Sequence, residues 1–162
     1  MFSVGDKVVY PMHGAGIIEA IEEKEILGAI KKYYIMKMPI GEMKVMIPLD
    51  NVQEIGLREI IDEEGVSQVF HVLRQHHAAI TSNWNRRYRM NMEKIKSGNI
   101  FEVAEVVRNL MIREREKGLS TGERKMLESA KQILLSELVL AKGIDEEQML
   151  DILNEVFEHQ KE

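Results

Sequence analysis

Cysteine is absent from the 162-residue chain, which also contains only three prolines. Without thiols the protein can form no disulfide framework and no cysteine-based metal site or nucleophile. No apolar run approaches the roughly 20 residues that a membrane span needs. The first six residues also lack the basic cluster and apolar stretch of a secretory signal. By elimination, we expect a soluble, cytoplasmic protein.

The sequence also lacks a convincing arrangement of catalytic or ligand residues. His76 and His77 are adjacent, so on a helix they point about 100° apart and cannot chelate one ion from one face. The segment 14–16 has two glycines of a dinucleotide-binding motif, but it lies between strand-like runs, which predicts a turn. The acids at 62–64 cannot converge on one cation from a single helix face. The sequence therefore predicts no enzyme, no cofactor and no metal site.

Charge is unevenly distributed along the chain, whose net charge is −5. Residues 83–97 hold five basic side chains and one acid, whereas residues 137–162 hold eight acids and two lysines. Tight DNA affinity comes mostly from cations that replace counterions on phosphates, so the net charge argues against a free-standing DNA binder. A local cationic face on an acidic body instead suggests nucleic-acid contact at one place.

The first 55 residues are typical of strands. Short β-branched or aromatic runs occupy residues 7–11, 17–26, 31–38 and 43–47. Several short strands in about 50 residues would leave both edges open in a flat sheet. This part of the sequence therefore predicts a small SH3-like or Tudor-like β-barrel over residues 1–55.

After Gly56 the apolar residues recur three and four positions apart, which predicts helices. We expect helices over 66–74 and 100–117, the second with Asn99 as its N-cap. Ser120 to Glu123 has the spacing of a capping box and opens a long helix that ends at Gly143. A last amphipathic helix covers 145–157. The fold class is thus α+β, with an all-α domain over residues 56–162 after the barrel.

The most informative segment is 82–92, which contains the only tryptophan, three arginines and three asparagines. On a helix, Arg86 and Arg89 share a face, Arg87 lies about 100° around, and Trp84 lies above the next aromatic ring. Arginines bind phosphates, asparagines reach sugars or base edges, and a flat ring stacks on or wedges between bases. This mixture indicates contact with nucleic acid.

A purely structural interpretation of the same segment remains open. Trp84, Tyr88, Met92 and Ile95 follow helical spacing and could form a core stripe. In that case the protein would be an interaction adaptor with a peptide-binding barrel and no direct DNA role. An RNA-binding module is a third possibility.

A second basic pair, Arg124 and Lys125, falls in the first turn of the long helix. Helix N-termini bind phosphate through free backbone N–H groups, and basic side chains add to that attraction. A charged, solvated helix start is the alternative interpretation.

Five blocks of sequence together resemble the CarD/CdnL family of bacterial RNA polymerase-binding transcription regulators. They are FSVGDKVVYPMHG (2–14), VFHVLR (69–74), NWNRRY (83–88), VAEVVR (103–108) and GLSTGERKML (118–127). The resemblance covers nearly the whole chain, and five blocks in order are far more specific than one motif.

The resemblance implies a Tudor-like domain, similar to that of transcription-repair coupling factors, that docks on the polymerase β subunit. It also implies a helical domain that meets promoter DNA without sequence specificity. By this resemblance Trp84 wedges into the minor groove at the upstream edge of the promoter bubble. The residues expected to hold DNA phosphates beside it are Arg86, Arg87, Arg89, Arg124 and Lys125.

On the polymerase side the resemblance points to Lys24, Lys44, Met46 and Pro48. Lys24 and Met46 stand where some family members have arginine, so the side-chain interface differs from theirs. We expect a strand edge at 42–47 to pair with a polymerase strand, because backbone pairing tolerates side-chain change. A monomer is the favoured oligomeric state.

Overall fold

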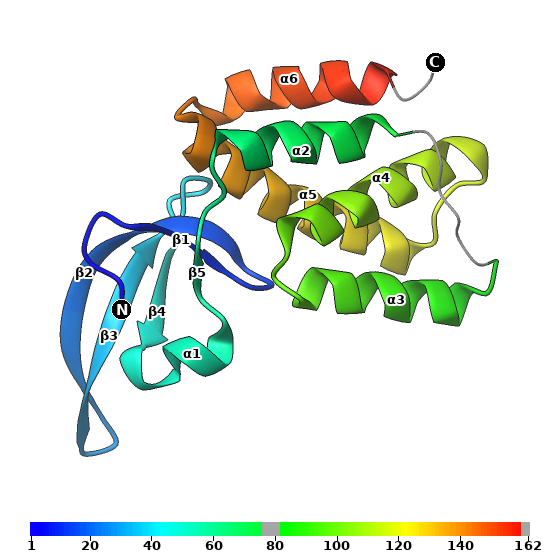
Figure 1. Ribbon diagram of the computed structural model, residues 1–162. Coiled ribbons are helices and arrows are strands. Elements are labelled where there is room, and N and C mark those ends of the chain that lie inside the picture. Colours follow the sequence, from blue (N-terminus) through cyan, green and yellow to red (C-terminus); the bar gives the residue numbers. More distant parts are fainter. Residues whose placement is uncertain (76–81, 160–162) are drawn as a thin grey trace.

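A computed structural model describes residues 1–75 and 82–159, which form a β-sheet unit and a helical unit packed against each other (Figure 1). The strands are β1 (Lys7–Tyr10), β2 (Gly14–Ile26), β3 (Ala29–Lys37), β4 (Lys44–Pro48) and β5 (Arg58–Glu59). They form one antiparallel sheet in the order β4-β3-β2-β1-β5. The short helices η1 (Leu49–Asn51) and α1 (Val52–Ile55) follow β4. The expected fold class, a small Tudor-like β unit followed by an all-α unit, is confirmed.

The strands curl around a small apolar core of their own. It contains Val8, Ile18, Tyr34, Met36 and Ile47, each no more than 1% exposed. Their neighbours along β1 and β3 point to the other side of the sheet, where Val9, Tyr33 and Ile35 are also at most 8% exposed. Parts of the sheet are therefore covered on both faces. A register shift between Ile18 and Ala20 bends β2. The two edges of the described sheet are β4 and β5.

The turn between β1 and β2 is shorter than the sequence suggested. We expected residues 14–16 to form a turn, but they already belong to β2, where Gly14 pairs with Tyr10 and Gly16 with Val8. Both glycines have close neighbours: a Cβ on Gly14 would lie 2.7 Å from Ser136 Oγ of the helical unit, and a Cβ on Gly16 would lie 2.7 Å from the carbonyl oxygen of Lys37 in β3. The turn prediction for these residues was wrong because they are already paired in β2. Gly14 is required by its φ of 108° and by its close approach to Ser136, and Gly16 by its close approach to β3.

The sheet continues past residue 55. Leu57 lies in the barrel core, and Arg58 pairs with Val9 of β1. A two-residue strand is too short to show alternation, so the sequence pattern could not reveal it. The division into two domains between residues 55 and 56 stays a prediction. Strand β5 follows that boundary in sequence but belongs to the sheet.

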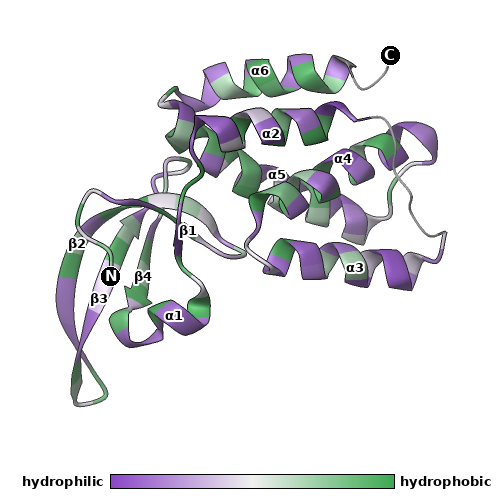
Figure 2. Cartoon of the chain, in the orientation of Figure 1, coloured by the Kyte–Doolittle hydropathy of each residue, from purple (hydrophilic) through white to green (hydrophobic). Residues whose placement is uncertain are grey.

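The helical unit comprises α2 (Glu63–Arg74), α3 (Trp84–Lys96), α4 (Ile100–Glu116), α5 (Thr121–Lys142) and α6 (Glu146–His159). All five helices begin with a side-chain cap, at Asp62, Asn83, Asn99, Ser120 and Asp145. Each helix has an apolar and a polar face (Figure 2), and the apolar faces share one core. His76 and His77 lie outside the described residues.

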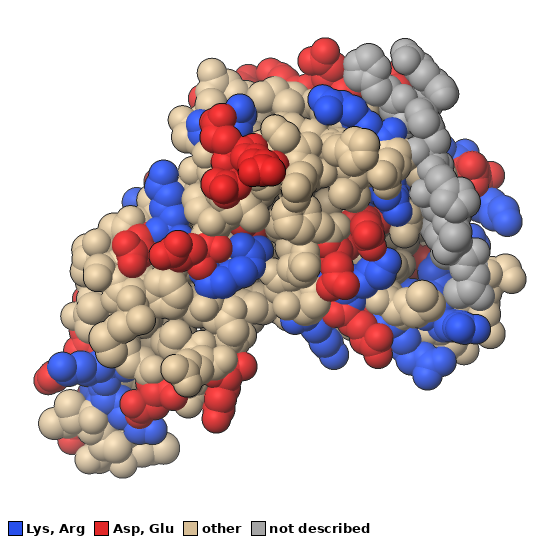
Figure 3. All heavy atoms as spheres, viewed as in Figure 1, with Lys and Arg blue, Asp and Glu red and all other residues tan. Residues whose placement is uncertain are grey.

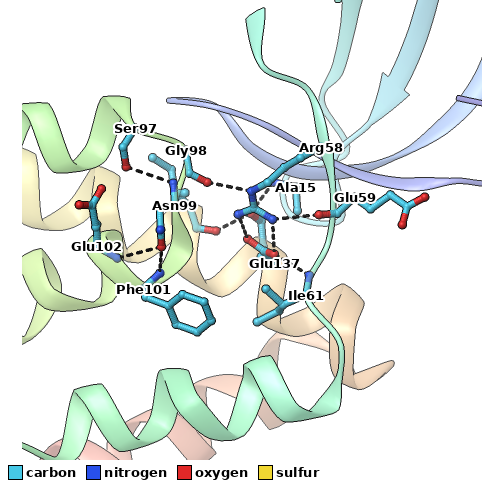
Figure 4. A network of polar contacts seen from close by, with 12 residues as sticks. Ala15, Arg58, Glu59, Ile61, Ser97, Gly98, Asn99, Phe101, Glu102 and Glu137 are labelled. Carbon is cyan, nitrogen blue, oxygen red and sulfur yellow. Dashed lines mark hydrogen bonds and ion pairs between the residues drawn. The ribbon is translucent and has the colours of Figure 1, made fainter. Parts of the chain in front are cut away.

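A buried ion pair joins the two units (Figure 4). Arg58 of β5 donates to both carboxylate oxygens of Glu137 on α5, at 2.9 and 2.8 Å. Glu137 is fully buried and also accepts the backbone N–H of Ile61. Arg58 Nε donates to the carbonyl of Gly98, between α3 and α4. One guanidinium therefore connects the sheet, α5 and the α3–α4 loop.

Two further contacts fix the same interface. The Ala15 N–H of β2 donates to Ser136 Oγ at 2.8 Å. Pro11 packs on Gly98, where an added Cβ would lie 2.9 Å from Pro11 Cγ. Because these approaches leave no room for a side chain at Gly14 or Gly98, the β unit and the helices meet at a defined position.

We expect Arg58→Ala to lower the free energy of unfolding by about 3 kcal/mol, because it leaves the Glu137 carboxylate buried without its cation. Urea unfolding at neutral pH measures this change. The matched control is Lys24→Ala, which removes an exposed pair with Glu22 and should cost less than about 0.5 kcal/mol. The double variant Arg58→Met with Glu137→Leu should recover much of the lost free energy of unfolding, because it leaves no buried charge. Equal losses of stability for Arg58→Ala and Lys24→Ala would contradict the role of the Arg58–Glu137 pair.

Candidate functional site

Trp84 lies at the first turn of α3 and is 42% exposed, so it is not a core residue. Its ring stacks on Tyr88 one turn later, with centroids 5.0 Å apart and an interplanar angle of 21°. Farther along the same stripe, Met92 is partly buried and Ile95 is 3% exposed. The apolar stripe therefore enters the core at its C-terminal end and leaves an aromatic pair at its N-terminal end.

A hydrogen bond holds the indole in one orientation. Trp84 Nε1 donates to Ser120 Oγ at 3.0 Å. The same oxygen caps α5 by accepting the Glu123 N–H. Gly122 lies beside both rings, and a Cβ there would be 3.7 Å from Trp84 and from Tyr88. The start of α5 thus supports the exposed tryptophan at the start of α3.

Arg87 is placed differently from what the resemblance implied. It is 3% exposed, and its guanidinium donates to both carboxylate oxygens of Glu123, at 2.8 and 3.2 Å. Glu123 is itself 1% exposed. A side chain enclosed by this pair is not available to a phosphate, so the expectation of Arg87 as a phosphate ligand does not fit this structure. A helical wheel predicts the direction in which Arg87 points from α3. It cannot predict that a carboxylate 36 positions away lies on that side of the helix.

The other expected cations are on the surface. Arg86 and Arg89 are exposed on α3, next to Trp84 in sequence. Arg124 and Lys125 are exposed in the first turn of α5. The Trp84–Ser120 hydrogen bond places the starts of α3 and α5 side by side. Arg124 also approaches Glu114, but at 3.9 Å with both side chains largely exposed, which is a weak pair.

We use the name indole face for the surface side chains at the starts of α3 and α5, which are Trp84, Tyr88, Arg86, Arg89, Arg124 and Lys125. On α3, helical spacing points Arg86 and Arg89 roughly 140° or more away from Trp84. Lys and Arg side chains gather over α3 in Figure 3. Sequence reasoning identified the tryptophan and the arginines, but it did not connect Ser120 or Glu123 with them. Both had been noted for helix capping, and nothing in a linear sequence indicates a contact across 36 positions.

The residues expected on the polymerase side lie on the sheet. Lys44, Met46 and Pro48 alternate along β4, so they share one face, while Val45 and Ile47 point into the barrel. Met46 pairs with Ile35 of β3, which pairs with Ala20 of β2. Lys24 follows Ala20 on the same face, four positions farther along β2. The four expected residues therefore share one face of the sheet.

The strand edge itself is available. β4 is the last strand of the described sheet on its side. Met46 is 43% exposed, and the exposed Lys44 pairs with Glu19 at 3.0 Å. Such an edge presents backbone donors and acceptors to an incoming strand.

Within residues 1–75 and 82–159, no group of three or more His, Asp or Glu side chains is placed to hold a metal ion. Over the same residues, no helix has the length and hydropathy to cross a membrane.

The Arg87–Glu123 pair predicts an acid-sensitive part of the stability. Burial alone would raise the pKa of the Glu123 carboxyl, but hydrogen bonds from Arg87 and Ser120 and the charges of Arg87 and Arg113 lower it below its usual 4.5. A carboxyl whose pKa is lower in the folded than in the unfolded protein stabilises the fold at pH values above its unfolded-state pKa. That stabilisation is lost as the pH falls through the folded-state pKa. The stability advantage of the native chain over Glu123→Gln should therefore shrink below about pH 4.5 in urea unfolding. An advantage that does not change between about pH 7 and about pH 3.5 would contradict this assignment.

The Trp84–Ser120 bond can be tested with the single tryptophan. We expect Ser120→Gly to lower the fluorescence anisotropy of Trp84 and shift its emission, because the indole N–H loses its acceptor. Glycine is a tolerable N-cap, so the stability should fall by only a few tenths of a kcal/mol, roughly. Ser120→Thr keeps the hydroxyl and serves as the control. Identical spectra for Ser120→Gly and the native chain would rule out the bond.

Three comparisons relate the chain to known proteins. The family model described as "CarD-like/TRCF RID domain" matches residues 2–61, and the family model described as "CarD, C-terminal domain" matches residues 68–154. A curated relative, "Putative transcription factor YdeB" of Bacillus subtilis (strain 168), is 46% identical over 149 residues, covering 92% of this chain and 97% of that protein. The solution structure of the N-terminal domain of Myxococcus xanthus CarD is 36% identical, covers 36% of this chain and 79% of that one, and superposes with a TM-score of 0.32. The chain therefore belongs to the CarD family of transcription factors that interact with RNA polymerase.

Proposed function

We propose that this protein stabilises the open promoter complex by docking its β unit on the polymerase β subunit and inserting Trp84 at the upstream edge of the DNA bubble. The observation that carries the proposal is the half-exposed, fixed indole among surface cations at the start of α3. An aromatic side chain presented in this way can wedge into a minor groove and lean on unstacked bases.

The charge balance fits a protein that acts only while tethered. The chain carries 22 basic and 27 acidic residues, which disfavours tight binding to DNA from solution. Docking on polymerase would raise the effective concentration of the indole face at the promoter. Weak DNA contact is then sufficient, and DNA without polymerase is left unoccupied.

The cations that we assign to phosphates are Arg86, Arg89, Arg124 and Lys125, all of them exposed. Arg87 instead acts inside the protein, where its pair with Glu123 holds α3 against α5. An aromatic wedge and a few cations respond to groove shape more than to base identity. We therefore assign promoter choice to the polymerase and the promoter itself.

For the polymerase contact we propose strand addition at β4, with Lys24, Lys44, Met46 and Pro48 on the adjoining face. Backbone pairing would supply most of the contact, and side chains on one face would give it direction. The adaptor alternative, with Trp84 as a core residue, is disfavoured by the exposure of its ring.

Trp84→Ala should leave polymerase affinity unchanged and shorten the lifetime of the open complex on linear promoter DNA. If the indole stabilises the open form by about 1.4 kcal/mol, the open-to-closed ratio falls about tenfold. The lifetime is measured by challenging preformed complexes with a competitor.

Leu150→Ala is the matched control, because Leu150 of α6 is 41% exposed, close to the 42% of Trp84, but is not part of the indole face. It should leave the lifetime unchanged. An unaltered lifetime for Trp84→Ala would overturn the wedge role, while a loss of polymerase binding would place Trp84 in the docking surface instead.

A further inference from the structure

The hairpin between β2 and β3 extends well beyond the rest of the sheet (Figure 1). The register of β4 along β3 ends where Tyr33 pairs with Pro48, whereas β2 and β3 stay paired as far as Ile26 and Ala29. Residues 23–32 thus form a two-stranded ribbon that projects away from the helices. A ribbon of two strands is poorly stable alone, so its length needs a reason other than the barrel core.

The tip of this ribbon is apolar and exposed. Leu27 is 102% exposed, Ile30 69% and Ile26 48%. In Figure 3 the tip of the hairpin, at the lower left, is mostly uncharged. Basic and acidic side chains lie between this tip and the rest of the sheet. Isolated exposed apolar residues are common, but three at one projecting tip indicate a contact surface.

The backbone at Leu27 strengthens this interpretation. Leu27 has φ 54° and Gly28 has φ 81°, so both central residues of the turn have positive φ. Such two-residue turns favour Asn-Gly, because a leucine with positive φ is sterically strained. The Leu27 side chain is fully exposed and gains no burial that would offset this strain. A strained, exposed leucine is therefore better explained by a partner than by folding.

The charges of the ribbon point to a protein partner. Within residues 23–32 its acids are Glu23 and Glu25, and its bases are Lys24, Lys31 and Lys32. Because acids and bases nearly balance, the ribbon has little attraction to phosphates, in contrast to the indole face. The ribbon also lies at the opposite end of the molecule from the start of α3 (Figure 1), away from the DNA contact.

We propose that Leu27 is an anchor that inserts into an apolar depression on RNA polymerase. This rests on the docking part of the proposed function, which it deepens. Three observations favour polymerase as the occupant. The ribbon lies within the matched domain 2–61, it carries Lys24, and its β3 edge continues the open edge of β4. A strand added along β4 would reach the base of the ribbon.

The test is the variant Leu27→Asn, measured with the full chain and purified RNA polymerase of the same organism. Asparagine tolerates positive φ, so the melting temperature should stay equal or rise. The affinity for polymerase should nevertheless fall about tenfold or more, because the anchor is lost. Leu27→Met keeps an apolar side chain and should bind within about threefold of the native chain.

Met12→Asn is the matched control, because Met12 is also an exposed apolar residue with positive φ, at 75°, but lies in the β1–β2 turn. It should bind polymerase like the native chain. Native affinity of Leu27→Asn would overturn the anchor alone. Failure of the native chain to bind polymerase would overturn the docking proposal with it. If Leu27→Asn instead abolished a dimer of the native chain seen by light scattering, a second copy would be the occupant and the proposal would be wrong.

Discussion

The position of the two units depends on the ion pair between Arg58 and Glu137. A carboxylate with no exposed surface is costly unless it is fully paired, and here two guanidinium N–H groups and the Ile61 N–H satisfy it. Because Arg58 also reaches the carbonyl of Gly98, any rotation of the sheet against the helices would break several hydrogen bonds together. This requirement fixes the strand edge at β4 relative to the indole at the start of α3, which is what a tethered wedge requires.

Helix α5 carries this positioning from one end of the molecule to the other. Its N-terminal turn holds Trp84 through Ser120 and α3 through the Arg87–Glu123 pair. Its later turns contact the sheet through Ser136 and Glu137. The two buried carboxylates therefore lie on one rigid element, and each pairs with an arginine from a different part of the chain. A long helix with both anchors needs no separate linker to relate the docking edge to the DNA face.

Much of this arrangement was readable from the sequence, and the exceptions have a common cause. The strand and helix periods, the caps at Asn99 and Ser120 and the exposed arginines follow from local patterns. The assignment of Arg87 did not fit because its partner is distant in sequence, and β5 was missed because two residues show no period. The glycines at 14 and 16 were taken for a turn, although they lie in β2, where Gly14 approaches α5 and Gly16 approaches β3. Local chemistry was predictable, whereas contacts between distant segments were not.

In the proposed function, the weak affinity of the indole face for DNA is itself a functional constraint. A chain with a strongly cationic helical unit would bind any duplex, since phosphate contacts carry no sequence information. Enclosing Arg87 with Glu123 removes one cation from the surface and uses it to hold the helix that presents Trp84. Fewer surface cations lower the affinity for DNA at large, while a fixed indole retains its effect once polymerase brings it to the bubble. Rigidity and weak affinity are therefore complementary: the first makes the wedge effective at one place, and the second keeps it from acting elsewhere.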